Sequence, residues 1–253
     1  MAEAGLAPGP MPSSLSPDSW VRGLAALPLL HQPGQAWMYH TSSDLLGVLI
    51  ARASGQRFED FLEDRIFGPL GMKDTAFFAP DDKNERLATA YMADSQTGRL
   101  AVFDDARGGA WSRLPAFPSG GGGLVSTADD FQAFGRMLLD FGRFGSARIS
   151  SRPSVELMTI DHITPEQKAA SPFSPGFWQN NGWGFGVSIV TRRSGIADTP
   201  GRYGWDGGFG TSWRNDPKED MTCIFLIQRM MRGPDDIQLN EDFLTLAYQA
   251  IDD

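Results

Sequence analysis

The sequence has 253 residues, which is enough for one large domain or two small ones. It is 41% hydrophobic and 21% charged, a balance usual for a globular protein with a sizeable core. Its 31 acidic residues exceed its 22 basic ones, and the net charge of −9 argues against nucleic acids and anionic membrane surfaces as partners. No secretory signal opens the chain, and no stretch approaches the roughly 18 apolar residues of a membrane helix. Taken literally, the sequence predicts a cytoplasmic protein without a membrane partner.

The N-terminal stretch separates into two parts. Residues 1–19 are rich in Pro, Ser, Gly and Ala, and they predict a flexible segment. Residues 20–30 are mostly apolar and predict a short helix that Pro28 ends, because proline cannot continue a helical hydrogen-bond ladder.

Helix signals recur along the chain. The clearest helix is expected to start at Ser42 or Ser43, either of which can serve as N-cap, and to end at Gly55. Its leucines and isoleucine repeat at three- and four-residue spacing, which gives the helix one apolar face. Further helices are predicted at residues 58–66, 126–141, 154–158 and 240–251.

Strand signals dominate the chain before the final helix. Successive strands are predicted at residues 183–190, 211–217 and 221–229. The turn into the middle strand is expected at Gly207, Gly208 and Gly210. Cys223 has apolar neighbours, so a buried strand residue is expected rather than a catalytic thiol. Weak strands are predicted earlier, within a region of loops, at residues 90–92 and 100–103.

Several common catalytic motifs are absent from the sequence. The three histidines, His31, His40 and His162, do not have the spacing of metal ligands, and the sequence has only one cysteine. Neither a metal nor another cofactor is therefore expected. The glycine run at 120–123 is not followed by Lys-Ser or Lys-Thr and predicts a flexible turn rather than a phosphate-binding loop. A G-x-S-x-G elbow does not occur. A Ser-x-x-Lys pair does not occur either, because the residues three positions before the four lysines are Leu70, Pro80, Pro165 and Asn215.

Two aromatic patches need an explanation. Residues 37–47, WMYHTSSDLLG, place Tyr39 just before a predicted helix. Residues 203–213, YGWDGGFGTSW, place Trp205 and two glycines at the edge of a strand. Each patch alone has a plain interpretation, since a tyrosine can be a core residue and glycines can form a bulge.

Taken together, the patches resemble the serine β-lactamase and penicillin-binding-protein superfamily, and most closely its class C β-lactamase-related, esterase-type branch. The segment PGQAWMYHTSSDLLGVLIARASG is similar to the second motif of that branch and the helix after it. The segment GWDGGFGTSWRNDP is similar to the third motif, which is Lys-Thr-Gly in lactamases and His-x-Gly or Trp-Gly-Gly in the esterases. The order and spacing of the motifs carry the resemblance.

The resemblance implies acyl transfer through a serine ester intermediate. It implies that Tyr39 is the catalytic tyrosine that works as general base with a lysine of the first motif. Trp205, Asp206 and Gly207 would bind substrate as the third motif, and Gly208 would offer its backbone N–H to the oxyanion. Tyr39 and Trp205 are therefore expected to face one cleft. The implied fold is α/β, of the β-lactamase/transpeptidase-like type, with an antiparallel sheet flanked by helices and an added helical region.

The sequence departs from the family pattern in three ways. Thr41 stands two residues after Tyr39, where lactamases have Asn, and Trp205 replaces the lysine of the third motif. Both changes favour neutral esters over β-lactams, because the lysine would pair with a substrate carboxylate. Family members also carry Ser-x-x-Lys ahead of the tyrosine motif, so the first two strands and the nucleophile helix are expected to be missing. Without that lysine Tyr39 should remain a neutral phenol, since free tyrosine has a pKa of about 10.

These observations predict that residues 20–253 form the C-terminal portion of a β-lactamase-related domain. The leading function is that of a serine hydrolase, carboxylesterase-like, which acts on a small-molecule ester or amide and is present as a truncated form without its nucleophile. Whether this chain by itself is an enzyme stays open. The alternative is a non-catalytic homologue that binds a ligand or partner through the retained half of the cleft. The sequence leaves the oligomeric state open.

Overall fold

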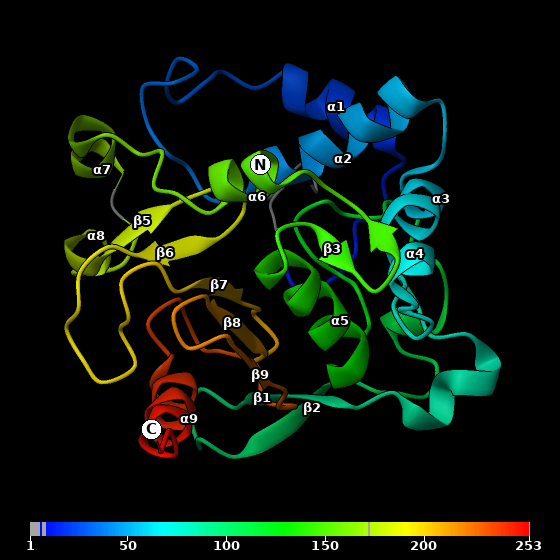
Figure 1. The fold of residues 1–253 in the computed structure, drawn as a ribbon. Helices are drawn as coiled ribbons and strands as arrows, with labels where there is room; N and C mark the ends of the chain where they lie inside the picture. Colours follow the sequence, from blue (N-terminus) through cyan, green and yellow to red (C-terminus); the bar gives the residue numbers. More distant parts are fainter. Residues whose placement is uncertain (1–5, 7–8, 172, 253) are drawn as a thin grey trace.

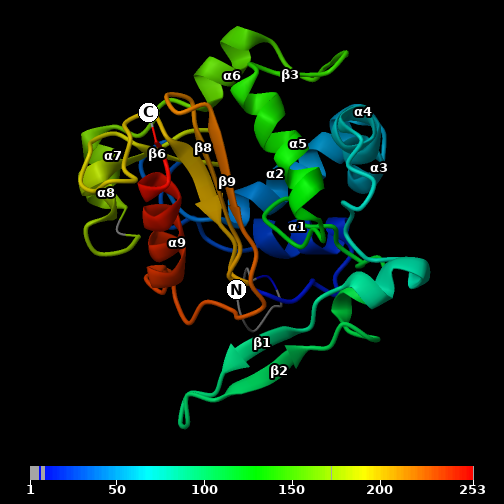
Figure 2. The ribbon, with the colours of Figure 1, turned by 60° about the horizontal axis from the view of Figure 1, so that its bottom comes forward.

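The computed structural model describes residues 6, 9–171 and 173–252. A five-stranded antiparallel sheet in the order β5-β6-β7-β8-β9 forms its centre. The strands are Asn181–Trp183 (β5), Ser188–Val190 (β6), Tyr203–Asp206 (β7), Ser212–Asp216 (β8) and Met221–Phe225 (β9). Helix α5 (Ala128–Leu139) and helix α9 (Gln238–Gln249) cover opposite faces of this sheet (Figures 1 and 2). The expected α/β fold with an antiparallel sheet flanked by helices is therefore confirmed.

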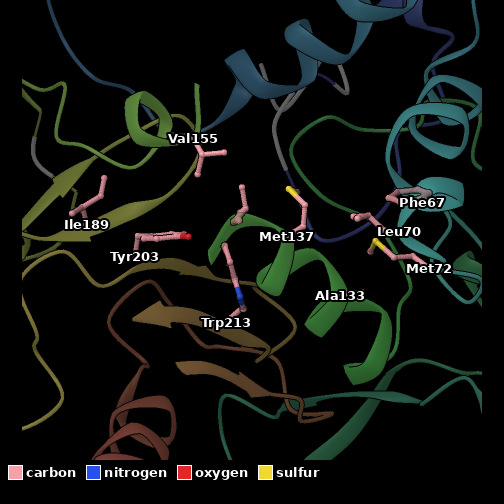
Figure 3. Close-up of a cluster of buried hydrophobic side chains, with 10 residues drawn as sticks. Phe67, Leu70, Met72, Ala133, Met137, Val155, Ile189, Tyr203 and Trp213 are labelled. Carbon is pink, nitrogen blue, oxygen red and sulfur yellow. The ribbon is translucent and has the colours of Figure 1, made fainter. Parts of the chain in front are cut away.

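Alternation along the strands explains how the sheet separates two cores. Cys223 of β9 packs against α9, whereas its neighbour Ile224 packs against the cluster that contains α5. Successive strand residues point to opposite faces, so one strand serves both cores. Figure 3 shows Tyr203 and Trp213 of the sheet directed toward Met137 of α5. The expectation of a buried Cys223 is confirmed, because only 7% of the residue is exposed.

The predicted strands differ from the structure at two points. The stretch 183–190 is not a single strand, because β5 ends at Trp183, the chain reverses, and β6 begins at Ser188 and pairs back onto β5. β7 was expected only as the edge beside a glycine turn, yet it is a central strand paired with both β6 and β8. Short apolar runs interrupted by glycines do not show by themselves where a strand reverses.

The N-terminal half contains a series of helices. Its helices are Pro17–Ala25 (α1), Thr41–Ser54 (α2), Phe58–Leu62 (α3) and Gly68–Leu70 (α4), with a π-helical turn at Glu63–Phe67 between the last two. The expected cap of α2 at Ser42 or Ser43 is wrong, because the N-cap is His40, whose carbonyl accepts a hydrogen bond from the Ser43 N–H at 2.9 Å. Gly55 ends α2 as predicted, in a left-handed conformation with φ of 69°.

The start of the described chain is packed against the body of the protein. The side chain of Ser16 caps α1 by accepting a hydrogen bond from the Ser19 N–H. Leu6 is 2% exposed and packs in a cluster with Trp20 and Phe117. The boundary expected at residue 20 therefore falls inside α1. The rest of the predicted flexible segment includes residues 1–5, 7 and 8, which lie outside the described residues.

The remaining elements surround the central sheet. A hairpin of β1 (Ala90–Ala93) and β2 (Leu100–Asp104) projects from the body, in agreement with the predicted weak strands (Figure 2). The other strands and α-helices are β3 (Arg143–Phe144), β4 (Ala147–Arg148), α6 (Arg152–Met158), α7 (Pro165–Ala170) and α8 (Phe177–Asn180), and 3-10 helices lie at Asp81–Arg86 and Ala110–Ser112. The sequence did not predict α7 and α8, which have only six and four residues. Among the described residues, no helix has both the length and the apolar character needed to cross a bilayer.

Candidate active site

Tyr39 lies directly before α2, at the end of an irregular segment that the fold anchors. The backbone N–H of Trp37 donates a hydrogen bond to the Ser171 hydroxyl at 2.7 Å and fixes this segment. The indole Nε1–H of Trp205, on β7, donates to the Tyr39 hydroxyl at 2.8 Å. The two residues are 166 positions apart in the sequence. The expectation that they face one cleft is confirmed, because both also line the same cavity.

This cavity has a volume of about 550 Å³ and lies where separate parts of the chain meet. The segment 36–43 forms one part of the wall, and Trp205 of β7 forms another. The reversal between β5 and β6, at residues 183–186, and the glycine pair Gly120 and Gly121 complete it, together with residues near α7. The cavity is large enough for a small organic ligand.

The hydroxyl of Tyr39 is protonated in this environment. Burial raises the pKa of Tyr39 above its ordinary value of about 10. The hydrogen bond from Trp205 opposes the rise, and the negative charge of Asp206 adds to it. Tyr39 is therefore a neutral phenol near pH 7 and cannot accept a proton in this arrangement without an added positive charge.

Asp206 follows Trp205 in β7, but its carboxylate is bound within the fold. It accepts hydrogen bonds from the Arg214 guanidinium at 2.7 Å and from the Asn240 side-chain amide at 3.0 Å. These contacts connect β7 to β8 and α9. The carboxylate does not line the cavity. The Asp206 side chain therefore supports the strand that carries Trp205.

Gly207 and Gly208 form the turn that follows β7. The Gly207 N–H donates to the Thr211 carbonyl at 2.8 Å, and the Gly208 carbonyl accepts from the Met231 N–H at 2.9 Å. The Gly208 N–H donates no hydrogen bond within the described part of the chain, and neither Gly207 nor Gly208 is among the residues that line the cavity. Gly210 closes the turn with φ of 89°, and a Cβ there would lie 2.2 Å from a backbone oxygen, so only glycine fits. A fixed turn with a free N–H has the character needed for an oxyanion donor.

The glycine run has a role that sequence reasoning missed. It was expected to be only a flexible turn, yet Gly121 is held between two side chains at the cavity wall. Its N–H donates to the buried Asp44 carboxylate at 3.3 Å. A Cβ at position 121 would lie 2.6 Å from Nδ1 of His40, so a larger residue would displace the histidine. This close approach, rather than flexibility, explains glycine at position 121.

Sequence reasoning also missed most of the aromatic lining. The rings of Trp183 and Trp205 meet edge to face at 4.5 Å, and Phe185 stacks on His162 at 4.6 Å. The available signal was the density of aromatic residues in 173–185, of which only Trp183 and Phe185 fall in the strand predicted at 183–190. No cluster of three or more potential metal-ligating side chains occurs within residues 6, 9–171 and 173–252.

A family model described as Beta-lactamase matches residues 2–244. The chain belongs to the β-lactamase family. Among curated relatives, this β-lactamase-family chain is 40% identical over 223 residues to Protein Rv1367c of Mycobacterium tuberculosis (strain ATCC 25618 / H37Rv), covering 86% of the chain and 55% of the relative. It is 29% identical over 235 residues to Esterase EstB of Burkholderia gladioli, and this match covers 85% of the chain and 55% of the relative.

Solved structures of other proteins have the same fold as this chain. EstCE1, described as a hydrolase with promiscuous acyltransferase activity, superposes with a TM-score of 0.74 at 24% sequence identity. The superposition covers 96% of this β-lactamase-family chain and 65% of that chain. The chain spans about half the length of the curated relatives it matches, at 55% for Protein Rv1367c and for Esterase EstB.

Proposed function

We propose that this β-lactamase-family chain carries the tyrosine half of an ester-hydrolase active site. In this proposal Tyr39 is a catalytic residue, and Trp205, Asp206 and Gly207 form the substrate-binding third motif, of which Trp205 lines the cavity and Asp206 supports the strand through Arg214 and Asn240. The Gly208 N–H, in the turn after this strand, binds the oxyanion. The hydrogen bond between Trp205 Nε1 and the Tyr39 hydroxyl, at the wall of a ligand-sized cavity, is the observation that carries it. The likeness to a relative named as an esterase supports the same reaction class.

The proposed reaction is nucleophilic acyl transfer. A serine hydroxyl attacks the ester carbonyl, its proton passes to the Tyr39 oxygen, and the alcohol leaves with a proton before water releases the acid. The Ser-x-x-Lys pair that would supply the nucleophile and the cation is not among the 253 residues. The proposal therefore requires this pair from outside the sequence, and it predicts that the 253 residues alone are inactive.

The cavity favours small neutral esters or amides over β-lactams. Of the described residues that line it, none is Lys or Arg, so a substrate carboxylate would lose its water without gaining a lysine or arginine partner from these residues. Trp205 occupies the position at which lactamases have lysine. An ester without a carboxylate avoids this unfavourable desolvation.

Ester hydrolysis before and after restoration of the first motif tests the proposal. The chain alone should hydrolyse p-nitrophenyl butyrate and nitrocefin at the buffer rate. A variant extended at its N-terminus by a relative's segment with Ser-x-x-Lys should hydrolyse the ester, with a higher kcat/KM than for a penicillin. In the extended protein, Tyr39→Phe should lose about 100-fold or more in kcat, whereas Tyr91→Phe, outside the cavity, should not.

Two results would count against this function. A covalent adduct of a fluorophosphonate probe on a serine of the 253-residue chain would show that it holds its own nucleophile. A folded but inactive extended protein that still binds ligands would support the alternative, a non-catalytic binding homologue.

A further inference from the structure

The cavity beside Tyr39 is a box of aromatic rings. Five aromatic side chains line it, and they are Trp37, Tyr39, Trp183, Phe185 and Trp205. The planes of Tyr39 and Trp183 meet at 81°, and those of Trp183 and Trp205 meet at 84°. These rings pack edge to face, with centroids 5.9 Å and 4.5 Å apart, so the wall that they form contains ring planes of more than one orientation.

The ionisable side chains among the described residues that line the box are Tyr39, His40 and His162. Of the described residues that line it, none is Lys, Arg, Asp or Glu. The carboxylates near its wall are held within the fold, since Asp206 is bound to Arg214 at 2.7 Å and Asp161 is bound to Lys168 at 2.5 Å. The buried Asp44 carboxylate accepts hydrogen bonds from the Ser119 hydroxyl and the Gly121 N–H. An anion would find no lysine or arginine in the wall of the box, and a primary ammonium group would find no carboxylate there to accept its three N–H donors.

We propose that this box binds a quaternary ammonium group, so that the substrates of the site are esters of the choline type. A quaternary ammonium carries a full positive charge but no hydrogen-bond donor, and the negative faces of tryptophan and tyrosine rings attract it without a counter-charge. The net charge of −9 favours the approach of a cation. The ester half of this inference rests on the proposed function, whereas binding of the ammonium group does not.

A cation in the box also fits the chemistry of Tyr39. Burial and the charge of Asp206 both disfavour the phenolate form of this residue. A positive charge next to the ring favours the phenolate. The ligand would therefore shift Tyr39 toward the form that can accept a proton, in the same sense as a neighbouring lysine.

A series of three ligands of nearly equal shape isolates the charge. Choline is cationic, 3,3-dimethyl-1-butanol replaces its nitrogen by carbon and is neutral, and 3,3-dimethylbutyrate is anionic. Their binding to the complete 253-residue chain can be measured by tryptophan fluorescence, since three of the seven tryptophans line the cavity. Choline should bind about tenfold more tightly than the alcohol, and the carboxylate more weakly than both.

A matched pair of substitutions separates the box from the general negative charge. Phe185 is 55% exposed and lines the box, whereas Phe141 is 48% exposed and does not, and both leucine substitutions leave the net charge unchanged. Phe185→Leu should weaken choline binding about three- to tenfold, and Phe141→Leu should leave it unchanged. Circular dichroism checks that both variants are folded.

Each outcome decides the inference. Choline binding that exceeds alcohol binding and falls only in Phe185→Leu supports it. Equal or tighter binding of the alcohol overturns it, and so does an equal loss in both variants, because the attraction would then be apolar or non-specific. These experiments measure binding and not catalysis, so a failure to bind choline would leave the proposed ester hydrolysis intact. Conversely, an extended protein that binds choline but hydrolyses no ester would reject only the hydrolase function.

Discussion

The pKa of Tyr39 is set by opposing influences, of which burial and the hydrogen bond from Trp205 are the largest. Burial raises its pKa, and the hydrogen bond from Trp205 lowers it. Trp205→Phe removes the donor but keeps a ring, so we expect the pKa of Tyr39 to rise further. Ultraviolet titration of tyrosinate absorbance measures this, with the Tyr39→Phe titration subtracted to remove the other three tyrosines. An unchanged or lower pKa in Trp205→Phe would contradict the role of this hydrogen bond.

Asp206 offers a second test at the scale of one residue. Its side chain and that of Arg214 are only 12% and 14% exposed. Asp206→Asn leaves the guanidinium without its charged partner in a nearly buried place, so we expect a loss of about 3 kcal/mol in unfolding free energy. The control is Asp18→Asn in the exposed pair with Arg52, which should cost under about 1 kcal/mol. Urea unfolding measures both, and equal losses would refute the argument.

Among the elements, helix α5 connects the sheet to the N-terminal helices. The Thr127 hydroxyl caps it by accepting a hydrogen bond from the Asp130 N–H at 3.2 Å. Thr127→Ala leaves that N–H without its partner and should lower the unfolding free energy by about 1 kcal/mol, whereas Thr127→Ser should keep the cap. Thermal unfolding of the two variants provides the measurement. If serine destabilises as much as alanine, the methyl group rather than the cap is responsible.

At the scale of the whole molecule, the 253-residue chain should self-associate. In the described part of the chain, β9 ends the sheet without a strand on its outer side, and free strand edges invite pairing with other chains. Leu46 and Leu49 of α2 are 55% and 52% exposed and share one helix face. We expect size-exclusion chromatography to show oligomers that increase with protein concentration.

Charged substitutions test which surface causes this association. Leu46→Glu with Leu49→Glu should shift the protein toward the monomer, whereas Leu246→Glu on α9, at a site 66% exposed, should not. A monomer at every concentration, with a sharp unfolding transition above about 60 °C, would show that these surfaces need no partner.

The sequence by itself determined the features that a few consecutive residues encode. Gly55 ends α2, Thr127 begins α5, and the apolar run around Cys223 forms a buried strand, because caps and periodicity act locally. The order of the Tyr39 and Trp205 motifs also indicated the β-lactamase family, which the family match confirmed. Both motifs could be found because their order and spacing along the chain match the family, although single residues such as Thr41 and Trp205 differ from the lactamase motifs.

Only the tertiary structure decided which of these residues meet. It joined Tyr39 to Trp205, placed Gly121 against His40, and paired Asp206 with Arg214. It also assembled the aromatic box from segments that the sequence separates by more than a hundred positions. Contacts of this kind depend on how the sheet twists and how the helices pack onto it. The twist and the helix packing are set by the packing of the whole chain and not by any local sequence pattern.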